Sequence, residues 1–212
     1  MSLKKLLEKV RLELKQKEEV KEEIQKNMRR ATRLSKQAIL YIHQTRLTEA
    51  KKLLKETSRL FTNLNKLSEN HPDLFYSGLV GAAFQEYAEA QVLLNVVEKE
   101  QFVSPESLGV PSIDYVLGLS DVIGELRRRA LDMLRKGNVK MAEKCLGIME
   151  QIYSELMAMD DAYMLIPGLR RKSDVARHVI EATRGDITIE SRRNSLEHSI
   201  RKLEKMMTKK QK

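Results

Sequence analysis

The sequence is poor in the residues that interrupt helices or crosslink small folds. It has four prolines and nine glycines in 212 residues, and neither type occurs before Pro72. A single cysteine, Cys145, excludes an intrachain disulfide and a cysteine-based zinc site. Tryptophan is absent, aromatic residues make up 5%, and the four histidines are scattered without the paired spacing of a zinc helix. Covalent or zinc stabilisation is therefore not expected.

Long hydrophobic runs are also missing. No apolar stretch approaches the roughly 18 residues that a membrane span requires. The N-terminus leads directly into alternating charge, which is not the pattern of a signal peptide. These absences predict a cytoplasmic protein that has no membrane partner.

Positive charge is the dominant feature of the composition. Lys and Arg number 39 against 30 Asp and Glu, which gives a net charge of +9. The hydrophobic fraction of 42% is sufficient for a packed core. A folded protein with a basic surface attracts nucleic acid or acidic membranes.

Apolar residues recur at helical spacing along the whole chain, and no strand pattern is found. We therefore predict an all-α fold, an elongated bundle of about seven helices that forms one domain over residues 1–212. A basic tail is expected to fray from about residue 208. The predicted helices cover residues 3–44, 48–67, 73–102, 112–136, 139–159, 170–183 and 187–207. At ~1.5 Å per residue the first would span roughly 60 Å, which favours packing along an elongated bundle or a partner chain.

Breaks between these helices are assigned to turn-forming residues. Ser112 is predicted as a helix N-cap, Gly137 and Asn138 as a helix end, and residues 184–186 (Arg-Gly-Asp) as a turn. The stretch between residues 103 and 111 is predicted to be a connector without a helix.

Two glutamates stand out in an apolar part of the third predicted helix. Glu86 and Glu89 are three residues apart, so they project from one helix face. Two carboxylates in an apolar setting repel each other, and Mg²⁺ or Mn²⁺ would relieve that repulsion. The simpler interpretation of such a pair is a solvated helix face.

A second acidic stripe follows on the next predicted helix. Asp114, Asp121 and Glu125 share it, and Gly118 lies on the same stripe, which indicates close approach of a helix or a ligand. If the two helices pack antiparallel, Glu86, Glu89, Asp121 and Glu125 would converge into an all-oxygen Mg²⁺ site, with Asp114 as a weaker candidate.

Basic clusters supply candidate contacts to phosphate. Arginines beside metal-binding acids are the components of phosphodiester hydrolysis. Each cluster taken alone is more typical of a solvated face than of a phosphate site. The candidates are Arg29, Arg30, Arg33, Arg127, Arg128, Arg129, Arg170, Arg171 and Lys172.

The acidic elements resemble those of the translin/Trax family. Residues 85–90 (QEYAEA) are similar to the Glu-Tyr-x-Glu-Ala element of Trax. Residues 114–126 (DYVLGLSDVIGEL) are similar to its Asp-Tyr-Leu-Leu-Gly-x-x-Asp-x-x-Gly-Glu-Leu element. The resemblance extends loosely over the chain, is stronger to Trax than to translin, and implies a seven-helix bundle. The short connector at residues 103–111 suggests a prokaryotic, archaeal relative.

That resemblance implies a Mg²⁺-dependent endoribonuclease that cuts RNA inside a basic oligomeric cavity. Glu86, Glu89, Asp121 and Glu125 match the catalytic acids, whereas Asp114 matches an acid that translin also retains. The expected substrate is single-stranded or short duplex RNA, with Mn²⁺ as a possible substitute metal. We expect a homo-oligomer, with an octamer as the first expectation. Assembly with a translin-like partner subunit is the alternative.

Other functions remain open on the sequence alone. A non-catalytic, translin-like nucleic-acid-binding protein would have the same basic excess. An all-α nucleoside triphosphate pyrophosphohydrolase also uses Glu-x-x-Glu, but its second acidic element has a different spacing. A ferritin-like di-iron protein requires Glu-x-x-His, which neither Glu86 nor Asp121 begins.

Overall fold

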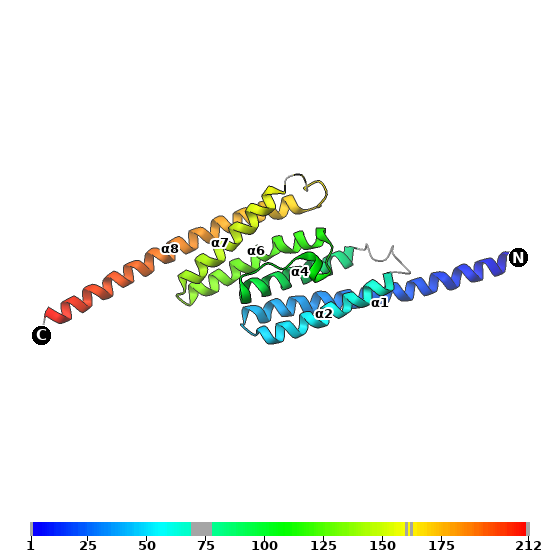
Figure 1. The fold of residues 1–212 in the computed structure, drawn as a ribbon, viewed down its shortest axis with the longest axis horizontal. Helices are drawn as coiled ribbons and strands as arrows, with labels where there is room; N and C mark the ends of the chain where they lie inside the picture. The colour runs from blue at the N-terminus through cyan, green and yellow to red at the C-terminus, as the bar shows by residue number, and fades with distance from the viewer. Residues whose placement is uncertain (1, 69–77, 160, 162, 211–212) are drawn as a thin grey trace. The chain divides into compact units, whose positions relative to one another are not determined.

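A computed structural model describes residues 2–68, 78–159, 161 and 163–210 of the chain (Figure 1). These residues contain seven α-helices and no strand, so the predicted all-α class is confirmed. The chain divides into two compact units, residues 1–118 and residues 119–212. The single domain predicted over residues 1–212 remains a prediction.

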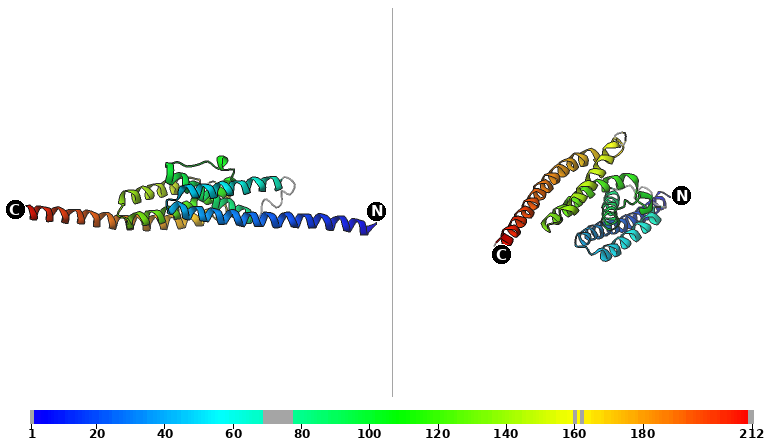
Figure 2. Two further views of the ribbon diagram at one scale, coloured as in Figure 1. Left: turned by 90° about the horizontal axis from the view of Figure 1, so that it is seen from below. Right: turned by 60° about the vertical axis from the view of Figure 1, so that its left-hand side comes forward.

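The first unit is built on a long helix, α1 (Leu3–His43), as the sequence predicts. It packs against α2 (Leu47–Ser68) and α4 (Gly78–Lys99). The contact involves the later part of α1, where Ile24, Met28 and Ala31 begin a buried stripe at spacings of four and three. Residues 2–16 are exposed, and this part of α1 extends beyond α2 and α4 (Figures 1 and 2).

Helix α4 is the central element of the first unit because it is buried on nearly every side. Its apolar residues are not confined to one stripe, which is typical of a helix enclosed by others. The Phe84 ring stacks on Phe61 of α2 with ring centroids 4.2 Å apart, and the Tyr87 ring lies tilted at 5.2 Å from Phe61. The buried set is Val80, Ala83, Phe84, Tyr87, Ala88, Glu89, Ala90, Val92, Leu93, Leu94 and Val96.

The predicted connector contains a short helix that the sequence pattern does not predict. This helix, α5 (Pro105–Leu108), has Ser104 as its N-cap and ends at Gly109, whose φ of 64° is left-handed. Helix α6 (Ser112–Arg135) follows. Ser112 is its first residue rather than its cap, because the Tyr115 N–H donates to the carbonyl of Pro111.

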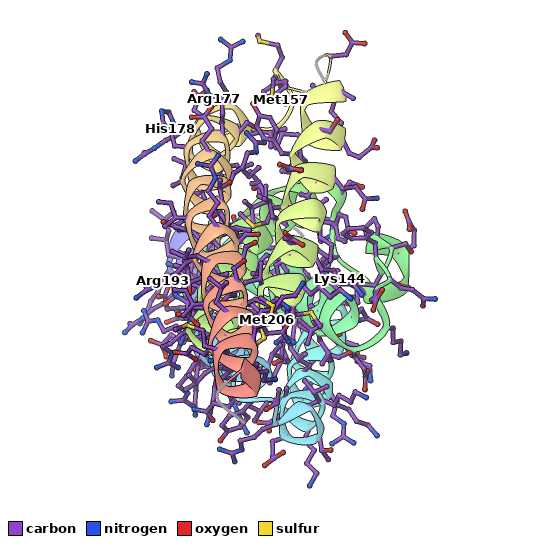
Figure 3. All side chains as sticks on the ribbon, turned by 90° about the vertical axis from the view of Figure 1, so that its left-hand side faces the viewer. Lys144, Met157, Arg177, His178, Arg193 and Met206 are labelled. Atoms are coloured by element: carbon purple, nitrogen blue, oxygen red, sulfur yellow. The ribbon has the colours of Figure 1, made fainter. Side chains whose placement is uncertain are left out.

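The second unit contains the remainder of α6 with α7 (Val139–Ala158) and α8 (Leu169–Lys210). The predicted break before α7 is confirmed: Gly137 adopts φ 73°, and Asn138 caps α7 by accepting from the Met141 N–H. Helices α7 and α8 pack side by side; Met157 is labelled on α7, and Arg177 and His178 are labelled on α8 (Figure 3).

The predicted turn at residues 184–186 is wrong, because α8 is continuous from Leu169 to Lys210. Side chains on both sides of Gly185 bind neighbouring helices of the unit. Arg184 bonds to Glu150 at 2.7 Å, and Asp186 bonds to Arg127 at 3.2 Å. These contacts offset the roughly 1 kcal/mol that glycine costs in a helix. Helix α8 ends at Lys210, and residues 211–212 of the predicted frayed tail lie outside the described residues, so that fraying remains a prediction.

The described residues therefore contain the predicted number of helices, but not the same helices. The sequence pattern divides α8 in two and omits α5, so the two errors cancel. None of the helices in the described ranges combines the length and hydropathy needed to cross a membrane.

Candidate nucleic-acid interface and carboxylate pairs

Glu86 and Glu89 project from the middle of α4, as their spacing predicts. The Glu86 side chain is 23% exposed, and its Oε1 lies 3.1 Å from the Lys36 Nζ of α1. Glu89 is a buried charged residue with 8% exposure. The Tyr87 ring, between them in the sequence, packs against Phe61 of α2. This turn of α4 therefore presents the aromatic ring and the carboxylates on different faces.

Gly118 fixes the approach of α6 to this turn of α4. A Cβ atom at position 118 would lie 2.6 Å from the Gln85 carbonyl oxygen, 2.9 Å from the Ala88 Cβ and 3.1 Å from the Glu89 nitrogen. Only glycine permits this contact, because real Cβ atoms are not found under 3.0 Å from such neighbours. The sequence predicts close approach of a helix or a ligand at Gly118, and the structure shows that helix α4 makes this approach.

Asp114 lies against the first turn of α4 rather than beside Glu86. An ideal Cβ at Gly81 would be 3.0 Å from the Asp114 Oδ1, so the absence of a side chain at Gly81 makes room for this carboxylate. Burial raises the pKa of Asp114 to about 6. This placement gives Asp114 a packing function in the first unit, and its predicted metal role remains a prediction.

Asp121 and Glu125 belong to the second unit, one helical turn apart on α6. The Asp121 carboxylate forms an ion pair with the Lys172 ammonium of α8, and the two side chains are 30% and 27% exposed. Glu125 lies 3.9 Å from the Arg128 guanidinium in the next turn. Each proposed carboxylate pair thus has a basic neighbour.

A pocket of about 440 Å³ surrounds the Asp121–Lys172 ion pair. Its walls are mainly apolar, with Ile123 from α6 and Val179 from α8. The full lining is Ser120, Asp121, Ile123, Gly124, Gly168, Arg171, Lys172, Val175, Ala176 and Val179. This pocket is called the α6–α8 pocket below.

The carboxylate pairs have the donor chemistry that Mg²⁺ prefers. Within the described ranges, no three His, Cys, Asp or Glu side chains come close enough to form a ready metal cluster. Mg²⁺ is commonly bound by one or two carboxylates together with waters and substrate phosphates, so a pair of acids is sufficient. Glu86 with Glu89, and Asp121 with Glu125, therefore fit as partial Mg²⁺ ligand sets.

Arg127 is engaged within the second unit. Its guanidinium donates to the Thr183 hydroxyl at 2.7 Å and to Asp186 at 3.2 Å. These bonds join α6 to α8, so Arg127 has a structural function there. Arg128 is more exposed, with a side-chain exposure of 53%. Arg170 and Arg171 are exposed in the first turn of α8.

Positive charge gathers between α1 and α2 of the first unit. Two adjoining hollows of about 660 and 480 Å³ share Arg30 and Glu56, whose side chains form an ion pair at 2.5 Å. We call this surface the α1–α2 groove. Its cationic side chains are Lys26, Arg29, Arg30, Arg33, Lys52, Lys55 and Arg59, and its acids are Glu22 and Glu56.

The groove contains predicted and missed residues. Arg29, Arg30 and Arg33 were expected from the sequence, whereas Lys52, Lys55 and Arg59 of α2 were not. These three recur at spacings of three and four, so helical periodicity could have found them. Lys36, which pairs with Glu86, is also absent from the predicted set. It lies three residues after Arg33, so helical periodicity could have found it too.

The fold and these features define a class: an all-α protein with a basic groove and helix-borne carboxylate pairs. The sequence profile of the translin family matches residues 19–209. An uncharacterised protein of Methanocaldococcus jannaschii is 36% identical over 176 residues, which are 82% of this chain and 78% of that protein. The chain belongs to the translin family.

Solved structures agree with this assignment. The chain is similar to apo-NeC3PO with a TM-score of 0.79 and 27% identity, over 87% of this chain and 96% of that one. It is similar to AfC3PO in a complex with duplex RNA with a TM-score of 0.78 and 35% identity, over the same shares. A second crystal structure of AfC3PO gives a TM-score of 0.78 and 34% identity.

Proposed function

We propose that this protein is a cytoplasmic, Trax-like endoribonuclease that binds RNA and hydrolyses it with Mg²⁺. The α1–α2 groove is the observation that carries RNA binding, because its seven cations greatly outnumber its two acids. Cationic side chains bind phosphates and release condensed counterions, which gives affinity without reading sequence. The AfC3PO relative, crystallised with duplex RNA, supports RNA as the partner.

Hydrolysis is assigned to the carboxylate pairs. Glu86 and Glu89 in the first unit, and Asp121 and Glu125 in the second, are the proposed Mg²⁺ ligands. When bound, Mg²⁺ supplies a Lewis acid for the phosphoryl oxygens. The chain itself holds the acids in place: the contact of Gly118 with the backbone of α4 fixes the turn that presents Glu89.

Assembly is part of the proposal. A homo-oligomer, with an octamer as the first expectation, would place several grooves on one RNA. A translin-like partner subunit is the alternative arrangement. The second candidate function is a non-catalytic RNA-binding protein, which the α1–α2 groove supports equally well.

A cleavage and binding experiment separates the two candidates. Labelled single-stranded and duplex RNA are incubated with Mg²⁺ or EDTA and with wild type or Glu86→Gln/Glu89→Gln. We expect Mg²⁺-dependent cutting that the double variant loses while its RNA affinity stays within about twofold, because the proposal assigns phosphate binding to the α1–α2 groove and not to the acids. RNA binding without cutting by the wild type would establish the non-catalytic alternative.

A second pair of variants tests the groove. Lys55→Ala/Arg59→Ala should weaken RNA binding and lower the slope of log K against log salt by about 0.7–0.9 for each phosphate that is no longer neutralised. Lys144→Ala/Arg177→Ala removes the same charge from exposed positions on α7 and α8 (Figure 3). Equal weakening in both double variants would show that only net charge matters and would contradict the groove.

A further inference from the structure

Lys172 has an environment unlike that of an ordinary surface lysine. Its ammonium pairs with the Asp121 carboxylate, and the two side chains are only 27% and 30% exposed. The pair lies in the α6–α8 pocket, whose Ile123 is buried and whose other walls are largely apolar. Charges in such a setting interact more strongly than charges in water.

The partner of Lys172 is one of the proposed Mg²⁺ ligands, so the inference rests on the proposed function. An ammonium and a divalent cation are both attracted to the carboxylate oxygens. A cation that approaches Asp121 must either displace the Lys172 ammonium or share the carboxylate oxygens with it. Both cost free energy. The neighbouring Arg171 lines the same pocket, but its side chain is exposed to solvent.

We propose that Lys172 is a positioning residue that competes with the metal ion for Asp121. It holds the carboxylate in place when the metal is absent, and it sets the metal concentration at which the site fills. A bound divalent cation would take over the Asp121 oxygens that now pair with the ammonium, and Lys172 would then turn from Asp121 toward solvent. The site thereby responds to the supply of divalent cation.

Direct metal binding tests this without any assay of RNA cleavage. Mn²⁺ is titrated into the purified protein, and free Mn²⁺ is quantified by its electron paramagnetic resonance signal. We expect Lys172→Met to bind Mn²⁺ about three- to tenfold more tightly than the wild type, because a half-buried competitor has been removed. Lys172→Arg, which keeps a cation beside Asp121, should stay close to the wild type.

Arg171→Met is the matched control. It removes the same charge from the adjacent position of the same pocket, and its effect should stay below about twofold because an exposed charge is screened. Thermal unfolding of each variant confirms that it is folded. The double variant Asp121→Asn/Lys172→Met should not show the gain in affinity.

The outcomes distinguish this inference from the proposed function. Unchanged affinity in Lys172→Met, or equal gains in Lys172→Met and Arg171→Met, would overturn the competition and leave the metal site intact. Failure of every form to bind Mn²⁺ at millimolar concentration would overturn both the competition and the Mg²⁺-dependent nuclease.

Discussion

At the scale of single residues, helix α6 carries two positions with unusual surroundings, Gly118 and Asp114. Gly118 contacts the backbone of α4, whereas an ideal Cβ at Gly124 of the same helix has no described atom within 4 Å apart from its chain neighbours and the local helix backbone. Asp114 is held half-buried, against the preference of a carboxylate for water. Both features can be tested by small substitutions.

Gly118→Ala should destabilise the protein. The added methyl would overlap the Gln85 carbonyl, and overpacking of this kind costs about 1–3 kcal/mol, more than the helix propensity that alanine gains. Gly124→Ala is the control in the same helix and should stabilise by up to about 1 kcal/mol. Urea denaturation at one protein concentration measures both, and equal stability of the two variants would contradict the close contact.

Asp114 should make stability fall as the pH rises. Its pKa is about 6 in the folded chain against 3.8 for an ordinary Asp, so the folded state holds the proton more tightly. The loss of folding stability caused by the buried Asp114 charge is absent below about pH 4, develops between about pH 4 and 6, and is complete above about pH 6.

Asp114→Asn should therefore stabilise the protein at about pH 7.5 and not at about pH 4. The expected gain is about 1 kcal/mol, after allowance for solvent screening at a half-exposed carboxyl. Urea denaturation at the two pH values, with EDTA present, measures it. A gain of the same size at both values would show that burial of the charge is not the cause.

At the scale of elements, α8 shows where sequence patterns fail. Arg-Gly-Asp is typical of a turn, yet Arg184 and Asp186 bind Glu150 and Arg127, which are 34 and 59 residues away in the sequence. Local propensity carries no information about such distant partners. The same limit hid the Asp121–Lys172 pair, whose members are 51 residues apart.

Gly185→Ala tests the continuity of α8. Apart from its neighbours in the chain and the local backbone of α8, no described atom lies within 4 Å of an ideal Cβ there, so alanine should stabilise the helix by about 0.5–1 kcal/mol. Gly168, with φ 91° at the start of α8, is the contrasting position, and alanine there should destabilise. Thermal unfolding compares the two variants, and a lower stability of Gly185→Ala would favour the turn.

Periodic features, in contrast, could be predicted. The bounds of α1, α6 and α7 follow from apolar spacing and differ from expectation by one residue or less. Glu86 and Glu89 were found because helical spacing alone places them on one face. The short helix α5 was missed because four residues are too few for a period to appear.

At the scale of the whole molecule, two helix ends expose apolar side chains. Leu3, Leu7, Val10 and Leu14 form such a row on α1, at spacings of four and three. Ile189, Leu196, Ile200, Leu203 and Met207 form another on α8. Spacings of this kind are those of helices that pack against further helices. The predicted homo-oligomer would cover these rows.

Leu196→Glu/Leu203→Glu should reduce the mass of the assembly. We expect the wild type to be an oligomer at micromolar concentration in light scattering after size-exclusion chromatography, because apolar rows of this length are rarely left in water. Glu197→Gln/Glu204→Gln, which leaves the row unchanged, is the control. A monomeric wild type would contradict the oligomeric proposal.

The burial of α4 has a consequence for how the molecule fluctuates. Its backbone amides exchange when the helices packed on it open, and these include α1, α2 and the Gly118 turn of α6, so α4 should be among the last segments to exchange hydrogen for deuterium. The exposed N-terminal part of α1 should exchange early. Glu86 and Glu89 are thus carried by a segment that should open rarely, which keeps their mutual spacing constant while more exposed helical segments open and close.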